Sequence, residues 1–261
     1  MRRLNFPSKQ DSYQQITSHL LNVDTPLNYS LEYLLVNYGD KAVPALMQAL
    51  PARPWYEQQV ILDTLGKIGD IRSIVPICAL IYEESISTGL SDAILTGALR
   101  SLVYHTPQRK KAITIIIDTM LKYRECSRVL TAVLKVQNDK FTIKNVYKKL
   151  FKQGHSHLKE SAIIIVGEDN ANTQFRIKYL KKMHVRLKGS PLKDRAIAAL
   201  KILISKKRCQ CLCRDKGLKF DAFFQRPDSE SYDCCCVDKN NKRLLIKFEG
   251  GVIPKKSDTH F

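Results

Sequence analysis

Apolar residues recur at helical spacing along most of the chain. Between residues 13 and 203, segments of about 11 to 18 residues each carry an apolar stripe, and short polar, Gly or Pro breaks separate them. No convincing stretch with a period of two residues interrupts this region. The pattern therefore predicts a mostly α region that is built from many short helices.

The breaks place a cap helix near residues 10–22, then five helix pairs, and then a closing helix at about 191–206. The first helices of the pairs are predicted at 27–38, 55–68, 89–104, 125–136 and 155–167. The second helices are predicted at 41–50, 71–82, 107–124, 140–152 and 170–188. Such a succession indicates an α-solenoid, in which each pair packs on its neighbours.

The period changes after Arg208. Cysteine or apolar residues occupy every second position over 209–214, 218–224 and 244–249, which is the spacing of a β-strand. The sequence DKNNK at 238–242 is typical of the turn in a hairpin between residues 232–237 and 243–249.

The two patterns divide the chain into two expected domains. A helical repeat domain is expected over residues 1–207, and a small Cys-rich β appendage over residues 208–261. The appendage is predicted to be an antiparallel sheet of three or four strands. We expect it to cover the open end of the solenoid, because end repeats need a cover.

One phrase of the sequence occurs twice. Residues 37–50 read NYGDKAVPALMQAL and residues 65–81 read LGKIGDIRSIVPICALI, with the Gly-Asp pairs 30 residues apart and the Val-Pro pairs 32 apart. A glycine at this place suits the left-handed residue that ends a helix, and the following aspartate can cap the next one. The positions concerned are Gly39, Gly69, Asp40, Asp70, Pro44 and Pro76. The prolines fall near helix starts, where a lost amide hydrogen bond costs least.

This phrase resembles HEAT repeats of the bacterial, phycobilisome-lyase-like kind. The specific match covers about residues 34–81, and the later units share only the period. The resemblance implies a right-handed α-solenoid whose second helices line a concave binding face. The chain would then be a binding module or a scaffold for protein–protein interaction and assembly.

Positive charge is concentrated in the middle of the chain. The formal net charge is +18, and residues 101–210 contain 25 Lys and Arg against seven Asp and Glu. The predicted second helices of the last three pairs carry plus 4, plus 5 and plus 6, while their first helices are close to neutral. A field of this sign favours phosphate-rich partners, although a basic surface can also serve solubility.

The sorted charge predicts a basic concave groove that binds DNA or RNA through the phosphate backbone. The predicted contact residues are Arg109, Lys110, Lys111, Lys144, Lys148, Lys149, Lys152, Arg176, Lys178, Lys181, Lys182, Arg186 and Lys188. Aromatic residues among them are candidates for stacking on bases, or else belong to the core. They are Tyr147, Phe151, Tyr179 and His184.

Two other functions fit the same composition. The groove could bind an acidic protein surface, as an assembly scaffold does. The basic helices also resemble those of HEAT-like alkylpurine DNA glycosylases, in which a carboxylate acts within the groove. Asp118 is the only acid in the three basic second helices, and it is also placed to pair with Lys122. The sequence contains no nucleotide-binding glycine motif, zinc-protease helix or nucleophile elbow, so we expect no cofactor.

The eight cysteines leave a metal site open. Cys211, Cys213, Cys234 and Cys236 could supply four thiolates to zinc, but their C-x-C spacing is unusual and also fits small buried residues of one sheet face. The chain contains no apolar run long enough to span a membrane and no apolar stretch of a secretory signal at its start. We therefore expect an intracellular protein, cytoplasmic or nuclear, with its cysteines as thiols or metal ligands. The oligomeric state has no signature in the sequence.

Overall fold

The computed structural model describes residues 18, 20, 27, 29–81, 91–124, 126–137, 139–168, 172–187, 189–215, 219–225, 232–238, 240 and 243–248. The chain divides into two compact units, unit 1 from Met1 to Gln137 and unit 2 from Asn138 to Phe261.

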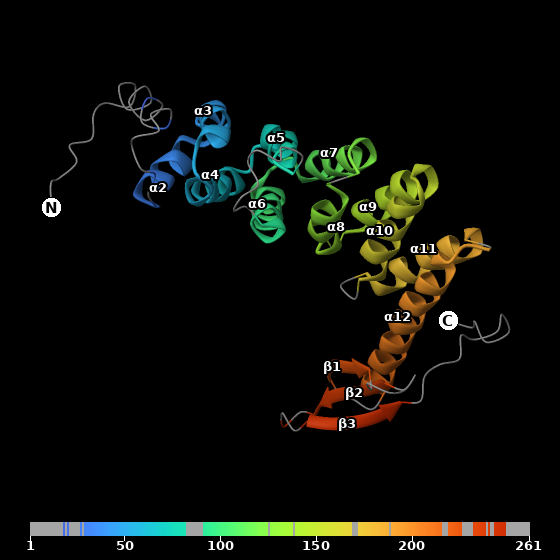
Figure 1. Ribbon diagram of the computed structural model, residues 1–261. Coiled ribbons are helices and arrows are strands. Elements are labelled where there is room, and N and C mark those ends of the chain that lie inside the picture. The colour runs from blue at the N-terminus through green and yellow to red at the C-terminus, as the bar shows by residue number, and fades with distance from the viewer. Residues whose placement is uncertain are drawn as a thin grey trace. The chain divides into compact units, whose positions relative to one another are not determined.

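Short helices make up the described part of unit 1 (Figure 1). They are α2 (Tyr29–Tyr38), η1 (Gly39–Lys41), α3 (Val43–Ala49), η2 (Leu50–Ala52), α4 (Trp55–Ile68), η3 (Ile71–Ser73), α5 (Ile74–Ala79), α6 (Asp92–His105), α7 (Arg109–Lys122) and α8 (Ser127–Lys135). The predicted helix at 55–68 coincides with α4, and the other described helices begin and end within a few residues of their predicted bounds. The predicted cap helix at 10–22 lies outside the described residues, except for residues 18 and 20.

The Gly-Asp turns act largely as the sequence predicts. Gly39 and Gly69 have φ angles of 62° and 72°, so both occupy the left-handed region at the ends of α2 and α4. The Asp70 carboxylate accepts a hydrogen bond from the Arg72 backbone N–H at 2.8 Å, which caps η3. Asp40 instead lies within η1, where no side-chain cap forms, and its carbonyl accepts a bond from the Arg72 guanidinium at 3.1 Å. The two turns are thereby joined.

Successive first helices of unit 1 pack directly on one another. Helix α2 contacts α4, α4 contacts α6, and α6 contacts α8, while α5 packs on α7. Gly66 permits the close approach of α4 and α6, because a Cβ there would lie 2.9 Å from the Ala98 carbonyl oxygen. The core between these helices consists of fully buried aliphatic side chains such as Leu65 and Leu99.

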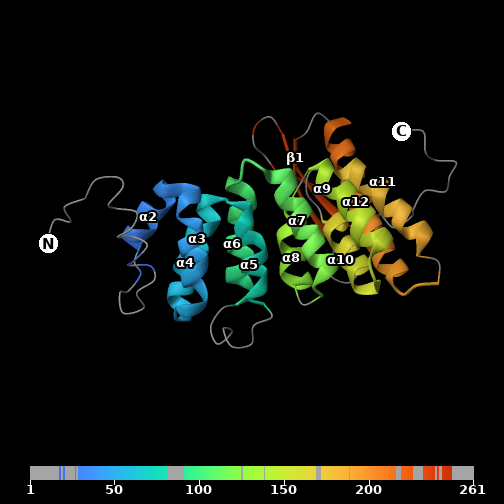
Figure 2. The same ribbon diagram turned by 90° about the horizontal axis from the view of Figure 1, so that it is seen from above.

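Unit 2 combines helices with a small sheet. Its elements are α9 (Lys140–Asn145), the π-helical turn η4 (Val146–Phe151), α10 (Ser156–Gly167), α11 (Thr173–Arg186), α12 (Leu192–Asp215), β1 (Lys219–Gln225), β2 (Tyr232–Val237) and β3 (Arg243–Phe248). Helices α10, α11 and α12 lie side by side (Figure 2), and η4 packs on α10 and α11. The mostly α class predicted from the sequence is confirmed.

The strand predicted at residues 209–214 is wrong, because α12 continues through this segment to Asp215. The alternation C-x-C-x-C also fits a helix: Cys209 and Cys213 are four residues apart, share one face and are both fully buried. No Gly or Pro interrupts the segment, so nothing ends the helix after Lys206. The expected domain boundary after residue 207 therefore falls inside α12.

The three strands form one antiparallel sheet in the order β1-β2-β3 (Figure 1). Strands β2 and β3 make the hairpin expected from the sequence, with Tyr232 opposite Phe248 and Val237 opposite Arg243. In their connection the Asp238 carboxylate accepts a hydrogen bond from the Asn240 N–H at 2.8 Å, as the DKNNK turn predicts. Both β1 and β2 contact α12, so the sheet packs against this helix.

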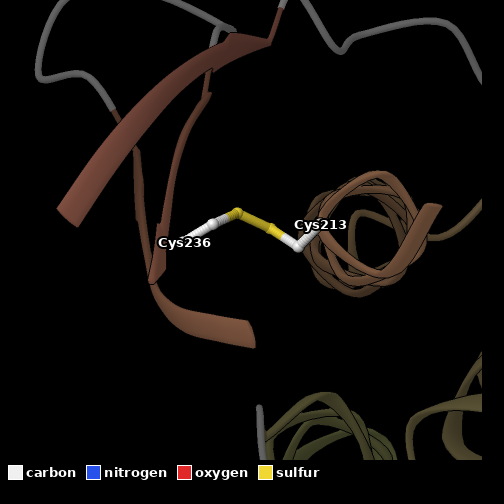
Figure 3. The surroundings of a disulfide bond; sticks show 2 residues. All are labelled: Cys213 and Cys236. Carbon is white, nitrogen blue, oxygen red and sulfur yellow. A yellow bond between two sulfur atoms is a disulfide. The ribbon is translucent and has the colours of Figure 1, made fainter. Parts of the chain in front are cut away.

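A disulfide joins this helix to the sheet. Cys213 of α12 is bonded to Cys236 of β2, with their Cα atoms 6.0 Å apart (Figure 3), and Cys209 is also disulfide-bonded. The expectation that the cysteines are thiols or metal ligands is wrong for these three residues. It holds for Cys78 and Cys126, which are buried thiols of unit 1 with the Cys126 Sγ 3.5 Å from the Cys78 carbonyl oxygen. The Cys126 contact and burial both raise the pKa of the Cys78 thiol.

Candidate nucleic-acid interface

Two basic segments of unit 2 are held together by aromatic side chains. The Tyr147 ring of η4 lies 4.9 Å from the Tyr179 ring of α11, and it stacks on Phe151 at 5.6 Å. Phe175 adds a further ring 4.9 Å from Tyr179. Tyr147, Phe151 and Tyr179 are 5%, 3% and 9% exposed, so these rings belong to the core and are not available to stack on bases. His184 is half-buried in the last turn of α11.

Cations from both segments gather over this aromatic pair. The Lys152 ammonium lies 5.7 Å from the centre of the Tyr147 ring, and the Arg186 guanidinium lies 6.0 Å from the same centre. The Lys182 ammonium lies 5.2 Å from the centre of the Tyr179 ring. Cation–π attraction at these distances holds the three charged groups near one another. The chain positions them from two helical segments that are about 30 residues apart in sequence.

The other ends of the two segments also meet. Lys140 at the start of α9 lines a hollow of about 650 Å³ together with Lys178 and Lys181 of α11. Residues 172–175, which include the start of α11, and Ile177 complete the lining. The amide groups of a helix start add partial positive charge, so the hollow is electropositive.

The basic side chains between these two ends follow two stripes. Lys140, Lys144, Lys148 and Lys152 are four residues apart along α9 and η4, and Lys178, Lys182 and Arg186 are four apart along α11. All seven are exposed, as is Lys181, whereas Lys149 is half-buried. We call the surface formed by these eight exposed residues the basic face: Lys140, Lys144, Lys148, Lys152, Lys178, Lys181, Lys182 and Arg186.

Little negative charge opposes the basic face. Residues 140–151 and 173–186 contain no Asp or Glu. The acid directly before α9, Asp139, caps that helix: its carboxylate accepts hydrogen bonds from the Thr142 N–H at 2.8 Å and from the Thr142 hydroxyl at 2.7 Å. The charge of the face is therefore available to an outside anion.

Arg176 is the residue for which the predicted contact role is wrong. It has no exposed surface, and its guanidinium donates to the carbonyl oxygens of Ile165 at 2.7 Å and Val166 at 3.3 Å. These carbonyls belong to the last turn of α10, where a helix leaves its acceptors without internal partners. Arg176 therefore supports α10 and cannot contact a partner of the protein.

The remaining predicted contact residues are not members of the basic face. Arg109, Lys110 and Lys111 are exposed in the first turn of α7, in unit 1, and Lys188 lies outside the described residues. Lys140 was not among the predicted contacts, although its spacing of four residues from Lys144 was a signal that could have included it. Asp118, the candidate catalytic acid, is exposed on α7.

The four candidate zinc ligands do not form a thiolate cluster in this structure. Cys213 and Cys236 are bonded to each other, Cys211 is a half-buried free thiol, and the side chain of Cys234 lies outside the described residues. No group of three or more His, Cys, Asp or Glu side chains that could hold a metal ion occurs in the described part of the chain. Two of the four sulfur atoms are thus engaged in a bond that a zinc ligand cannot make.

Comparisons with known proteins give no relative: no family model, no curated protein and no solved structure matches this chain. Among the helices that the structure describes, none is long and apolar enough to cross a membrane.

Proposed function

We propose that the protein binds nucleic acid, DNA or RNA, and that the basic face of unit 2 receives the phosphate backbone. The observation that supports this proposal is the meeting of two basic stripes at both of their ends. One end is the hollow that Lys140 shares with Lys178 and Lys181, and the other is the aromatic pair under Lys152, Lys182 and Arg186. A polyanion lying along these helices can neutralise several cations at once.

The buried rings favour binding that does not depend on sequence. Because Tyr147 and Tyr179 are in the core, the face offers mainly ammonium and guanidinium groups, with the half-buried Phe175 ring at the hollow. Such groups contact phosphates, which carry no base information. We therefore propose an affinity that is similar for mixed sequences and that falls steeply as salt rises.

A matched pair of variants tests the proposal. In the face variant, Lys152, Lys182 and Arg186 are replaced by Gln. In the control variant, three basic residues of α10 and α12 in the same unit, Lys159, Lys193 and Lys201, are replaced by Gln. Both variants lose the same formal charge, so a difference between them reports position and not net charge.

The assay is equilibrium binding of the full chain to mixed-sequence DNA and RNA at about 50 mM salt, where counterion release is still large. The face variant is expected to lose about tenfold or more in affinity, and the control variant much less. Equal losses in the two variants, or no binding by the unmodified chain, would refute the proposal. Retention of polyglutamate without retention of nucleic acid would instead favour an acidic protein partner.

A further inference from the structure

A second hollow is formed by residues of unit 1 alone, none of which belongs to the basic face. It measures about 330 Å³ and is lined by Arg100, Ser101 and Tyr104 of α6, by Arg109 at the start of α7, and by Val136 and Gln137 after α8. Small-molecule sites in proteins begin at roughly this size. Two guanidinium groups and no carboxylate are among the lining side chains, so the hollow is electropositive.

Neutral acceptors hold both guanidinium groups in place. Arg100 donates to the Ala132 carbonyl oxygen from Nη2 at 2.8 Å and from Nε at 3.3 Å. Arg109 donates from Nη2 to the Gln137 side-chain oxygen at 2.7 Å. Because a carbonyl and an amide carry no charge, these bonds orient the two arginines without neutralising them.

The amide that orients Arg109 is itself part of the core. Gln137 is only 6% exposed, and its Nε2 donates to the Val133 carbonyl oxygen at 3.3 Å. A buried amide with both ends bonded has one fixed orientation. The position of Arg109 at the hollow is therefore set before any ligand arrives, which lowers the entropy lost on binding.

An exposed aromatic ring stands beside the two arginines. Tyr104 is 80% exposed, and its ring stands nearly perpendicular to the His105 ring, with the two ring centres 5.0 Å apart. The Nδ1 atom of His105 lies 2.9 Å from the Ser101 carbonyl oxygen, which fixes that second ring. Val136 adds an aliphatic wall that is 38% exposed. A flat apolar group can pack on these two side chains, as bases do in nucleotide pockets.

We propose that this hollow is a nucleotide-binding site, in which Arg100 and Arg109 bind a phosphate and Tyr104 stacks on the base. The arginines supply the forked donors that suit phosphate oxygens. The ring and Val136 supply an apolar surface that inorganic phosphate cannot use. The ligand is a free mononucleotide or the phosphate-bearing end of a nucleic-acid strand. The site stands independently of the basic face, because none of its lining residues belongs to that face.

The test measures equilibrium binding of three probes to the full chain: adenosine 5′-monophosphate, adenosine and inorganic phosphate. It is carried out on the unmodified protein and on the face variant, which keeps this hollow intact. The monophosphate is expected to bind at least tenfold more tightly than either fragment, because it alone engages both the arginines and the ring. This preference is expected to persist in the face variant even if the basic face binds no nucleic acid.

Single substitutions assign the two halves of the site. Tyr104→Ala is expected to weaken monophosphate binding about fivefold or more and to leave phosphate binding unchanged. Arg109→Gln is expected to weaken both about tenfold. Lys110→Gln, which removes an exposed cation from the same turn of α7 without touching the hollow, is the control and is expected to change binding less than twofold. Circular dichroism verifies that each variant is folded.

A short oligonucleotide with and without a 5′-phosphate distinguishes the two ligand sources. If the ligand is a free mononucleotide, the 5′-phosphate does not change the affinity of the protein for the oligonucleotide. If the ligand is the end of a strand, the 5′-phosphate raises this affinity, and Tyr104→Ala abolishes the increase. The proposal fails if the monophosphate does not bind saturably. It also fails if folded Arg109→Gln protein binds the monophosphate as tightly as the Lys110→Gln control does.

Discussion

Replacing Arg176 by Met separates the structural role of this residue from the binding role of its neighbours. Methionine keeps an unbranched apolar chain in the fully buried position but removes the guanidinium. The carbonyl oxygens of Ile165 and Val166, which accept from Arg176 at 2.7 Å and 3.3 Å, then lose this partner at the end of α10.

The expected loss of stability follows from these two hydrogen bonds. A hydrogen bond to a charged group contributes about 1.5 to 3 kcal/mol, and the longer bond to Val166 counts at the low end of that range. Removing a buried charge also relieves its desolvation, which offsets part of the loss. A net loss of about 2 kcal/mol in the free energy of unfolding is expected, which lowers the urea midpoint by about 1 M.

Urea unfolding followed by circular dichroism measures this loss, and nucleic-acid binding is measured on the same samples. The matched control is Lys178→Met, two residues along the same helix on an exposed lysine. Arg176→Met is expected to lose stability and keep its affinity, while Lys178→Met is expected to keep stability and lose affinity. If Arg176→Met left the urea midpoint unchanged, the role assigned to this residue would be wrong.

Three further predictions concern single sites. Gly69→Ala should destabilise unit 1 by more than about 1 kcal/mol, because φ at Gly69 is 72° and an added Cβ would lie 2.8 Å from backbone atoms of residues 105 and 106. Gly97→Ala is the control and should not destabilise unit 1, because nothing lies within 4 Å of a Cβ at that position. Thermal unfolding of the two variants measures the difference. The pKa of Asp70 should lie below 3.8, because hydrogen bonds from Arg72 outweigh burial, which raises it. Its contribution to stability is then complete above pH 3.8 and lost as pH falls through the lowered pKa, and Arg72→Gln should raise that pKa in an NMR titration. In mass spectrometry without reductant, the unmodified protein should give a peptide pair linked through Cys213 and Cys236, and Cys213→Ser should lack it. The same substitution should lower the free energy of unfolding of unit 2 by about 3 kcal/mol, because it opens a loop closed over 23 residues.

The sequence could predict the helices of unit 1 because their ends are determined locally. Gly69 can take a left-handed conformation and stops α4 after Ile68, as the pattern indicates. The segment after Lys206 contains no such local signal. Residues 209–214 satisfy strand and helix spacing alike. The helix buries both Cys209 and Cys213, and it places Cys213 within bonding distance of Cys236 in β2.

The basic stripes could also be predicted, since spacing alone places Lys178, Lys182 and Arg186 on one side of a helix. The burial of Arg176 was readable too: it precedes Leu180 by four residues and Met183 by seven, which puts it on the apolar stripe. The charge of Arg176 suggested an exposed side chain, but its spacing from Leu180 and Met183 indicated the buried side of the helix, where it lies. The partner that holds it there comes from α10, and no local pattern identifies such a tertiary contact.

The salt dependence of nucleic-acid binding tests the basic face most directly. The slope of log affinity against log salt counts the phosphates that the protein neutralises, at about −0.7 per contact for single strands and about −0.9 for duplex DNA. Replacing Lys152, Lys182 and Arg186 by Gln should make the slope shallower by about 2 to 3, while the control at Lys159, Lys193 and Lys201 should leave it nearly unchanged. A slope that is the same in both variants and in the unmodified protein would contradict the assignment of this face as the nucleic-acid interface.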